Sequence, residues 1–213
     1  METLHIFDFI AAFIGLVYIY LEYKASIWLW LVGMIMPAID IYVYWEAGLY
    51  ADSGMAVYYT LAAIYGFVAW KMPRKTKNKP AQEVKISHIK KRETINATLA
   101  FAALWAVIYY ILITFSNSTI PITDAFVNAL SIVALWALAK KYIEQWLIWI
   151  VVDVVFTILA FHKGLIFKPS LYALYVIIAI FGYRKWLKTY REEKGKWDKT
   201  NNIMNVFNAK RRR

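Results

Sequence analysis

The chain has 213 residues, 61% of them hydrophobic, and carries a formal net charge of +11. Soluble domains are about 45–50% apolar, so a chain of this size has more apolar surface than a soluble core can bury, and the excess is expected to face lipid. With no cysteine in the sequence, a disulfide framework and a cysteine-ligated metal site are both excluded. The composition therefore predicts an integral membrane protein.

Apolar runs along the chain predict an all-α fold of seven transmembrane helices. The expected spans are 6–22, 26–46, 53–71, 95–116, 123–139, 143–162 and 168–187. A polar, basic linker at 73–94 separates spans three and four, and a basic tail follows at 189–213. The first cation of the chain is Lys24, so span one lacks the basic start of a secretory signal and is expected to be retained.

The lysine and arginine residues predict the orientation of the spans. Of 25 such residues, 23 lie before span two, in the linker region, between spans five and six, or from the end of span seven onward. Only Lys163 and Lys168 lie on the opposite side. Cytoplasmic loops carry the excess of cations, so the pattern predicts a multi-pass protein of the inner (cytoplasmic) membrane with its N-terminus outside and its C-terminus inside. This topology accounts for the net charge, and no nucleic-acid partner is predicted.

An internal repeat divides the sequence. Shifting the chain by 116 residues aligns 16–72 with 132–188 without a gap, and 12 of the 57 positions are identical. The identical pairs include Trp30/Trp146, Tyr59/Tyr175, Gly66/Gly182 and Trp70/Trp186. We therefore expect two three-helix repeats, 1–72 and 123–188, joined by a connecting helix at 95–116 that makes them run parallel. Parallel repeats are typical of transporters that bind substrate near the bilayer midplane.

Span six holds the first candidate binding residues. Trp146, Trp149 and Asp153 are spaced i, i+3, i+7 and share one helical face. A carboxylate inside a membrane costs several kcal/mol unless it faces a partner or a wet cavity. The equivalent positions of the first repeat are Trp30, Gly33 and Pro37. Trp30 is a further candidate binding residue, and Gly33 and Pro37 leave room for a flat ring. The pattern predicts a cationic aromatic ligand stacked on tryptophan beside a counter-charge.

Other polar residues complete the expected site. Asp40 shares a helical face with Pro37, and the equivalent pair Tyr59 and Tyr175 is expected to close the cavity. Glu22 and Glu144 are interpreted as structural residues at the inner interface. The histidines are isolated, and no nucleophile or phosphate-loop motif occurs. We therefore predict no catalytic residue, no metal site, no cofactor and no enzyme activity.

Several of these residues resemble a known family. The WxxW pair within Lys141–Trp149, together with Gly66…Trp70 and Gly182…Trp186, resembles the PnuC-type vitamin transporters over about residues 15–190. The resemblance implies the 3+1+3 helix arrangement of SWEET-like transporters and a homotrimer. It also implies facilitated diffusion of a vitamin that is trapped inside the cell by phosphorylation.

The resemblance also bears on the substrate. The nicotinamide riboside branch has Asn at the position of Asp153 and amide side chains at four more positions, here Met36, Ala56, Ala63 and Phe181. A site that loses amides and gains a carboxylate suits an aminopyrimidine joined to a thiazolium cation. Thiamine is therefore the preferred substrate and nicotinamide riboside the alternative. A seven-helix membrane receptor or sensor that docks a partner through its basic tail is the alternative of another class.

Overall fold

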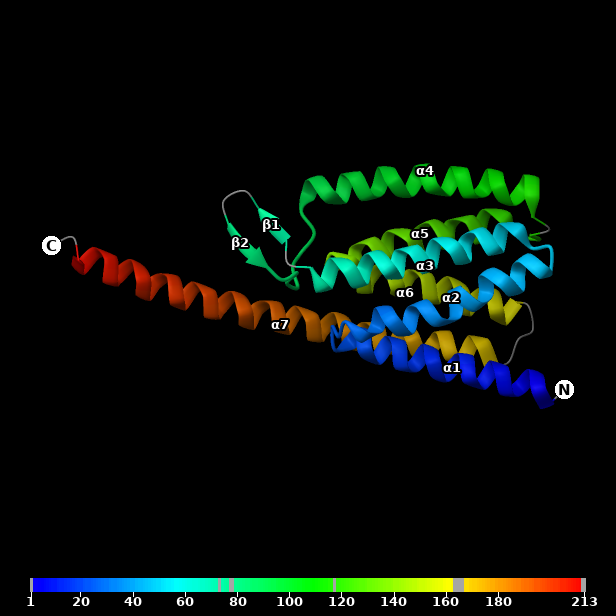
Figure 1. Ribbon diagram of the computed structural model, residues 1–213, viewed down its shortest axis with the longest axis horizontal. Coiled ribbons are helices and arrows are strands. Elements are labelled where there is room, and N and C mark those ends of the chain that lie inside the picture. The colour runs from blue at the N-terminus through cyan, green and yellow to red at the C-terminus, as the bar shows by residue number, and fades with distance from the viewer. Residues whose placement is uncertain (1, 73, 77–78, 117, 163–166, 212–213) are drawn as a thin grey trace.

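The computed structural model describes residues 2–72, 74–76, 79–116, 118–162 and 167–211. The seven predicted helices are confirmed among these residues (Figure 1). They are α1 (Glu2–Tyr23), α2 (Trp28–Glu46), α3 (Tyr50–Lys71), α4 (Lys91–Phe115), α5 (Pro121–Ala139), α6 (Gln145–His162) and α7 (Phe167–Arg211). Of these, α2, α4 and α5 are long and apolar enough to cross a membrane by length and composition.

Two features differ from the predicted elements. The basic linker contains a short antiparallel hairpin, β1 (Arg74–Thr76) and β2 (Lys79–Gln82), which lies outside the seven-helix bundle. Helix α7 continues without a break into the charged tail and projects beyond the bundle (Figure 1). This helix reaches Arg211, and the segment after Gly195 contains no proline that would end it.

The helices pack as two similar groups. Helix α2 packs along α3, and α6 packs along α7. Helix α1 contacts α2 and also α7, while α5 contacts α6 and also α3, so the first helix of each half touches the last helix of the other. Helix α4 lies on the outside against α5 (Figure 1). This exchange of contacts brings α1 to the face of α6 that carries the candidate site.

The turns that follow the first helix of each half have the same backbone geometry. The residues Ala25 and Lys141 are 116 positions apart, and both have positive φ angles, 52° and 54°. The amide of Ala25 bonds to the carbonyl of Glu22 at 2.8 Å, and the amide of Lys141 bonds to the carbonyl of Leu138 at 2.8 Å. Each is the left-handed residue of a Schellman motif that ends a helix. The limits of the two repeat units remain a prediction. The matching geometry of the two turns supports the repeat.

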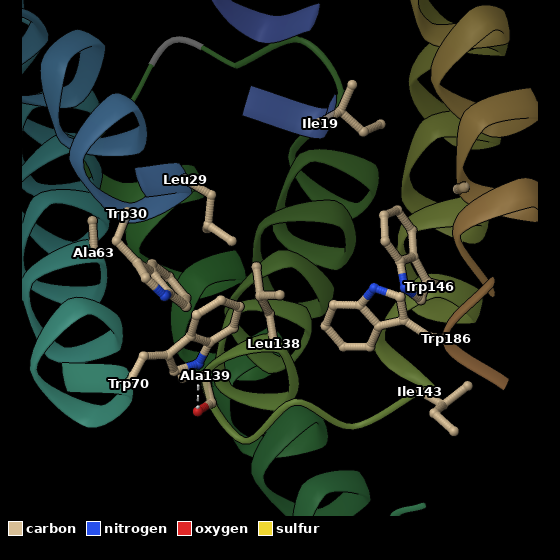
Figure 2. Close-up of a cluster of buried hydrophobic side chains, with 11 residues drawn as sticks. Ile19, Leu29, Trp30, Ala63, Trp70, Leu138, Ala139, Ile143, Trp146 and Trp186 are labelled. Carbon is tan, nitrogen blue, oxygen red and sulfur yellow. Dashed lines mark hydrogen bonds between the residues drawn. The ribbon is translucent and has the colours of Figure 1, made fainter. Parts of the chain in front are cut away.

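Tryptophans form the core between the two halves (Figure 2). Trp30 meets Trp70 edge to face, with ring centroids 5.5 Å apart and planes at 88°. Trp146 meets Trp186 in the same way, at 5.7 Å and 89°. The Trp70 indole also donates a 3.1 Å hydrogen bond to the Ala139 carbonyl, whereas the Trp186 indole N–H has no partner among the described residues. Leu138 lies between the two pairs in Figure 2.

Candidate functional site

Two cavities beside α1 hold predicted site residues in the described part of the chain. The acidic cavity, of about 210 Å³, lies between α1, α6 and α7. Its lining residues are Gly15, Tyr18, Ile19, Glu22, Trp146, Trp149, Val152, Asp153, Phe156, Tyr172 and Tyr175. The apolar cavity, of about 270 Å³, is lined by Ile14, Gly15, Tyr18, Trp30, Val32, Gly33, Met36, Pro37, Tyr59, Ala63, Leu135 and Trp149.

The two cavities are built from equivalent positions. Shifting the apolar lining by 116 residues converts Trp30, Gly33, Met36, Pro37 and Tyr59 into Trp146, Trp149, Val152, Asp153 and Tyr175. The small residues and the proline fall in one half, and the second tryptophan and the carboxylate fall in the other. The sequence expectation that Gly33 and Pro37 leave space is consistent with this lining.

Three residues form the shared wall between the cavities, namely Gly15, Tyr18 and Trp149. A Cβ atom at Gly33 would lie 2.8 Å from the Tyr18 ring, and one at Gly15 would collide with the Tyr175 hydroxyl. Glycine at both positions therefore lets aromatic rings approach the helix backbones. Each cavity alone is smaller than the roughly 300–1,000 Å³ of sites for drug-sized molecules, whereas the two volumes together fall within that range.

Trp146 and Trp30 are packed more tightly than a ring that is free to stack on a ligand. Trp146 is fully buried and Trp30 is 1% exposed. A Cβ atom at Gly182 would lie 2.6 Å from the Trp146 ring, and one at Gly66 would lie 2.5 Å from the Trp30 ring. With a glycine backbone on one side and a partner tryptophan at the edge, each ring forms a fixed wall of its cavity. Trp149, which faces both cavities, is the better placed ring for stacking.

Asp153 lies in the acidic cavity with an exposed fraction of 7%. Its backbone carbonyl accepts a hydrogen bond of 2.7 Å from the Thr157 hydroxyl. In the described part of the chain, no hydrogen bond to its carboxylate is found, although Tyr172 and Tyr175 lie close enough to interact with it electrostatically. None of the described residues lining this cavity is cationic. The carboxylate is therefore available to a positively charged guest.

The structure separates the other predicted residues. Tyr175 lines the acidic cavity and Tyr59 the apolar one, where the Tyr59 hydroxyl donates a 3.3 Å hydrogen bond to Asn128. Asp40 is half-buried on α2 and lines neither cavity. One turn of α2 separates Asp40 from Pro37, and that is enough to carry its side chain away from the cavity wall.

Glu22 is a cavity residue that sequence reasoning assigned to the interface. Its side chain is 2% exposed and lines the acidic cavity from α1. Position alone suggested an interfacial residue because Glu22 stands next to Lys24 at the end of the first span. The repeat held a stronger signal, since the equivalent position is the buried Leu138.

Glu144 has a defined structural role, in agreement with its interpretation. Its carboxylate lies 2.7 Å from His88 Nδ1 and accepts a 3.0 Å hydrogen bond from the Ile89 amide. Backbone hydrogen bonds between Ser87 and the loop that precedes α6 run alongside, at 3.1 and 3.0 Å. His88 is therefore not isolated. These contacts, which we call the linker clamp, hold the basic linker against the start of the helix that carries Trp149 and Asp153.

The site has no features of a metal centre, since no group of three or more metal-ligating side chains occurs among the described residues. Its aromatic walls, its uncompensated carboxylates and its position between two similar halves of an apolar helical bundle define a membrane transporter for a small molecule. A family model described as nicotinamide mononucleotide transporter matches residues 5–188, and the chain belongs to this family.

Individual relatives agree with this assignment. The chain is 26% identical to the nicotinamide riboside transporter PnuC of Escherichia coli, over 75% of this chain and 76% of that protein. It is 27% identical to the riboflavin/roseoflavin transporter RibM of Streptomyces davaonensis, over 88% and 87%. The crystal structure of the vitamin B3 transporter PnuC has a similar fold, with a TM-score of 0.65 and 24% identity, over 85% of this chain and 80% of that one.

Proposed function

We propose that this membrane transporter carries a cationic, aromatic, water-soluble vitamin by facilitated diffusion, with thiamine as the first candidate. The observation that carries the proposal is the acidic cavity, in which Trp149 and Asp153 line the same space without a cationic residue in the described lining. A positively charged ring gains from an aromatic face and from a nearby carboxylate that water does not screen.

Thiamine suits the paired cavities in shape as well as charge. It has two small rings on a short bridge, and the two cavities that share Trp149 are together large enough for both rings. In this arrangement the thiazolium lies in the acidic cavity beside Asp153. Phosphorylation adds negative charge that the same carboxylates repel, so a phosphorylated product leaves the transport equilibrium and stays inside the cell.

Nicotinamide riboside is the second candidate, because two of the similar proteins, from E. coli and Neisseria mucosa, are nicotinamide riboside transporters. Its nicotinamide ring is also cationic and flat. Met36 and Ala63, two of the positions where amides were expected for this ligand, line the apolar cavity. Phe181 is 55% exposed and faces a separate groove on the outside of α1. These apolar side chains offer few hydrogen-bond partners to the hydroxyl groups of the ribose. They therefore favour thiamine over nicotinamide riboside as the substrate.

The assembly and orientation belong to the same proposal. We expect a homotrimer in the inner membrane with the N-terminus outside, as the family resemblance and the distribution of cations imply. The two chain termini lie at opposite ends of the molecule, which agrees with an odd number of crossings (Figure 1). Cross-linking in native membranes and accessibility labelling of single cysteines, which the chain otherwise lacks, test the two points separately.

Uptake into proteoliposomes tests the function. Radiolabelled thiamine is expected to equilibrate across the membrane without an ion gradient, and unlabelled nicotinamide riboside to compete weakly. Efficient uptake of nicotinamide riboside with no uptake of thiamine would assign the chain to the second candidate. Binding of either vitamin without flux would instead favour a receptor or sensor, and uptake of riboflavin alone would contradict the charge argument.

A further inference from the structure

Glu22 has an unusual environment for a membrane carboxylate. Its side chain lines the acidic cavity on the α1 side, opposite the face of α6 that carries Asp153. The Gln145 side chain, which is fully buried, lies beside it. The Gln145 amide is close enough for a weak side-chain hydrogen bond with Glu22, yet Glu22 Oε1 and both polar side-chain atoms of Gln145 are buried without a hydrogen bond of good geometry in the part of the chain that the structure describes. Unsatisfied polar atoms of this kind are costly and call for an explanation.

Packing does not provide that explanation. The repeat places Leu138 at the position of Glu22 and Leu29 at the position of Gln145, and both leucines are fully buried (Figure 2). The equivalent positions of the repeat, Leu29 on α2 and Leu138 on α5, are thus apolar. Replacing buried ionic groups with apolar residues of similar volume is often neutral or stabilising. Glu22 and Gln145 are therefore kept at the expense of stability. Glu22 lines the cavity that also holds Asp153, and Gln145 lies beside Glu22.

Charge and hydrogen bonding indicate what these residues bind. Glu22 and Asp153 interact electrostatically across the acidic cavity, where the described lining offers no cation to neutralise them. A guest with one positive charge and a separate N–H donor satisfies both carboxylates. Asp153 lies beside the tyrosines and the stacking ring, whereas Glu22 lies at the end of the cavity near the turn at Ala25. The two acids thus suit two different groups of one ligand.

We propose that Glu22 is a second substrate-binding carboxylate, which accepts a hydrogen bond from an exocyclic N–H group of the cationic vitamin, and that Gln145 is the positioning residue that orients it. This inference rests on the proposed function. The N–H group is the amino group of an aminopyrimidine or the carboxamide of a nicotinamide. A neutral ligand leaves both acids without compensation, so the site selects against uncharged vitamins.

Four variants separate a binding role from a structural one. Glu22→Gln keeps the shape, and Glu22→Leu and Gln145→Leu reproduce the residues of the other half. Glu192→Gln, in the exposed extension of α7, is the matched control. Titration calorimetry of the purified full-length protein measures affinity for thiamine and for nicotinamide riboside, and thermal unfolding of each variant measures stability.

We expect at least tenfold weaker binding in both Glu22 variants, an intermediate loss in Gln145→Leu and no change in Glu192→Gln. The melting temperatures of the two leucine variants should equal or exceed that of the unmodified protein. Unchanged affinity in Glu22→Gln would overturn the inference while leaving the proposed function intact. Weaker binding that only accompanies a lower melting temperature would also overturn it, since it would show a structural role. Failure of the unmodified protein to bind either vitamin would overturn both.

Ligand analogues identify the group that Glu22 contacts. Oxythiamine replaces the amino group of thiamine with a carbonyl, and nicotinic acid riboside replaces the carboxamide with a carboxylate. If Glu22 accepts the N–H hydrogen bond, each analogue binds at least tenfold more weakly than its parent to the unmodified protein, and this difference largely disappears in Glu22→Gln. Equal discrimination in the two proteins would show that the N–H group is recognised elsewhere and would overturn the assignment of the contact.

Discussion

Ala25 and Lys141 stand at the same place in the two halves of the chain and are its two described non-glycine residues with a positive φ. Both end a helix in a Schellman motif, with hydrogen bonds of matching pattern. Left-handed backbone costs a non-glycine residue about 1–2 kcal/mol. Such a cost at two equivalent positions indicates that the turn itself, which sets the angle between the first two helices of each half, is what the structure requires.

Glycine at the first of these turns should therefore stabilise the protein. Ala25→Gly removes the steric cost and loses only one methyl group, which packs against the tryptophan core, and we expect the free energy of unfolding to rise by about 1 kcal/mol. Ala102→Gly, at an exposed position within α4, should lower it by a similar amount. Thermal unfolding in detergent measures both. A lower stability for Ala25→Gly would contradict the account of the turn.

The glycines beneath the tryptophan rings should not tolerate a side chain. Gly182→Ala places a methyl group 2.6 Å from the Trp146 ring, so the ring or α7 has to move, and we expect a loss of about 1–3 kcal/mol in stability. Gly195→Ala is the control, because a Cβ there meets nothing within 4 Å. This control should be neutral or slightly stabilising. Equal stabilities of the two variants would show that the contact with Trp146 is not close.

The two tryptophans of the WxxW pair should respond differently to substitution. Trp146→Ala removes a fully buried ring and should cost about 3–5 kcal/mol in stability. Trp149→Ala should lower affinity for the cationic vitamin at least tenfold with a much smaller loss of stability, whereas Trp149→Phe should restore part of the binding. Calorimetric titration and thermal unfolding, measured on the same samples, distinguish these outcomes. The reverse pattern would make Trp146 the stacking ring.

The linker clamp predicts a local effect on dynamics. Glu144→Ala removes the contact with His88 and the hydrogen bond from the Ile89 amide, which together contribute about 1–3 kcal/mol. The Ser87 amide donates to the Lys141 carbonyl and the Ile143 amide donates to the Ser87 carbonyl. Hydrogen exchange of both amides should become faster. Glu192→Gln should leave both rates unchanged. Unaltered exchange in Glu144→Ala would mean that the linker is held by its backbone pairing alone.

How much of this could be predicted from the sequence depends on the kind of signal. The seven helices were predictable because apolar length is a direct requirement of the bilayer. The face shared by Trp149 and Asp153 followed from helical spacing, and the space opposite followed from Gly33 and Pro37. The hairpin in the linker was not predictable, because Arg74–Thr76 and Lys79–Gln82 lack the alternating apolar pattern of a strand.

The position of Glu22 in the cavity could not be predicted from the sequence for a different reason. Hydropathy places it at the end of a span, and only the packing of α1 against α7 turns that end toward the cavity. The same packing leaves Asp40 outside, although spacing on α2 alone grouped it with Pro37. Burial of Trp146 beneath Gly182 likewise depends on the distance between α6 and α7, which the identity of the two residues does not specify.

The central claim is that Asp153 compensates the charge of a cationic vitamin, and one titration tests it most directly. Thiamine affinity is measured for the unmodified protein, for Asp153→Asn, and for Asp52→Asn, an exposed aspartate on α3. We predict that Asp153→Asn binds thiamine at least tenfold more weakly and that Asp52→Asn binds it normally. Equal affinity of all three proteins for thiamine would contradict the account.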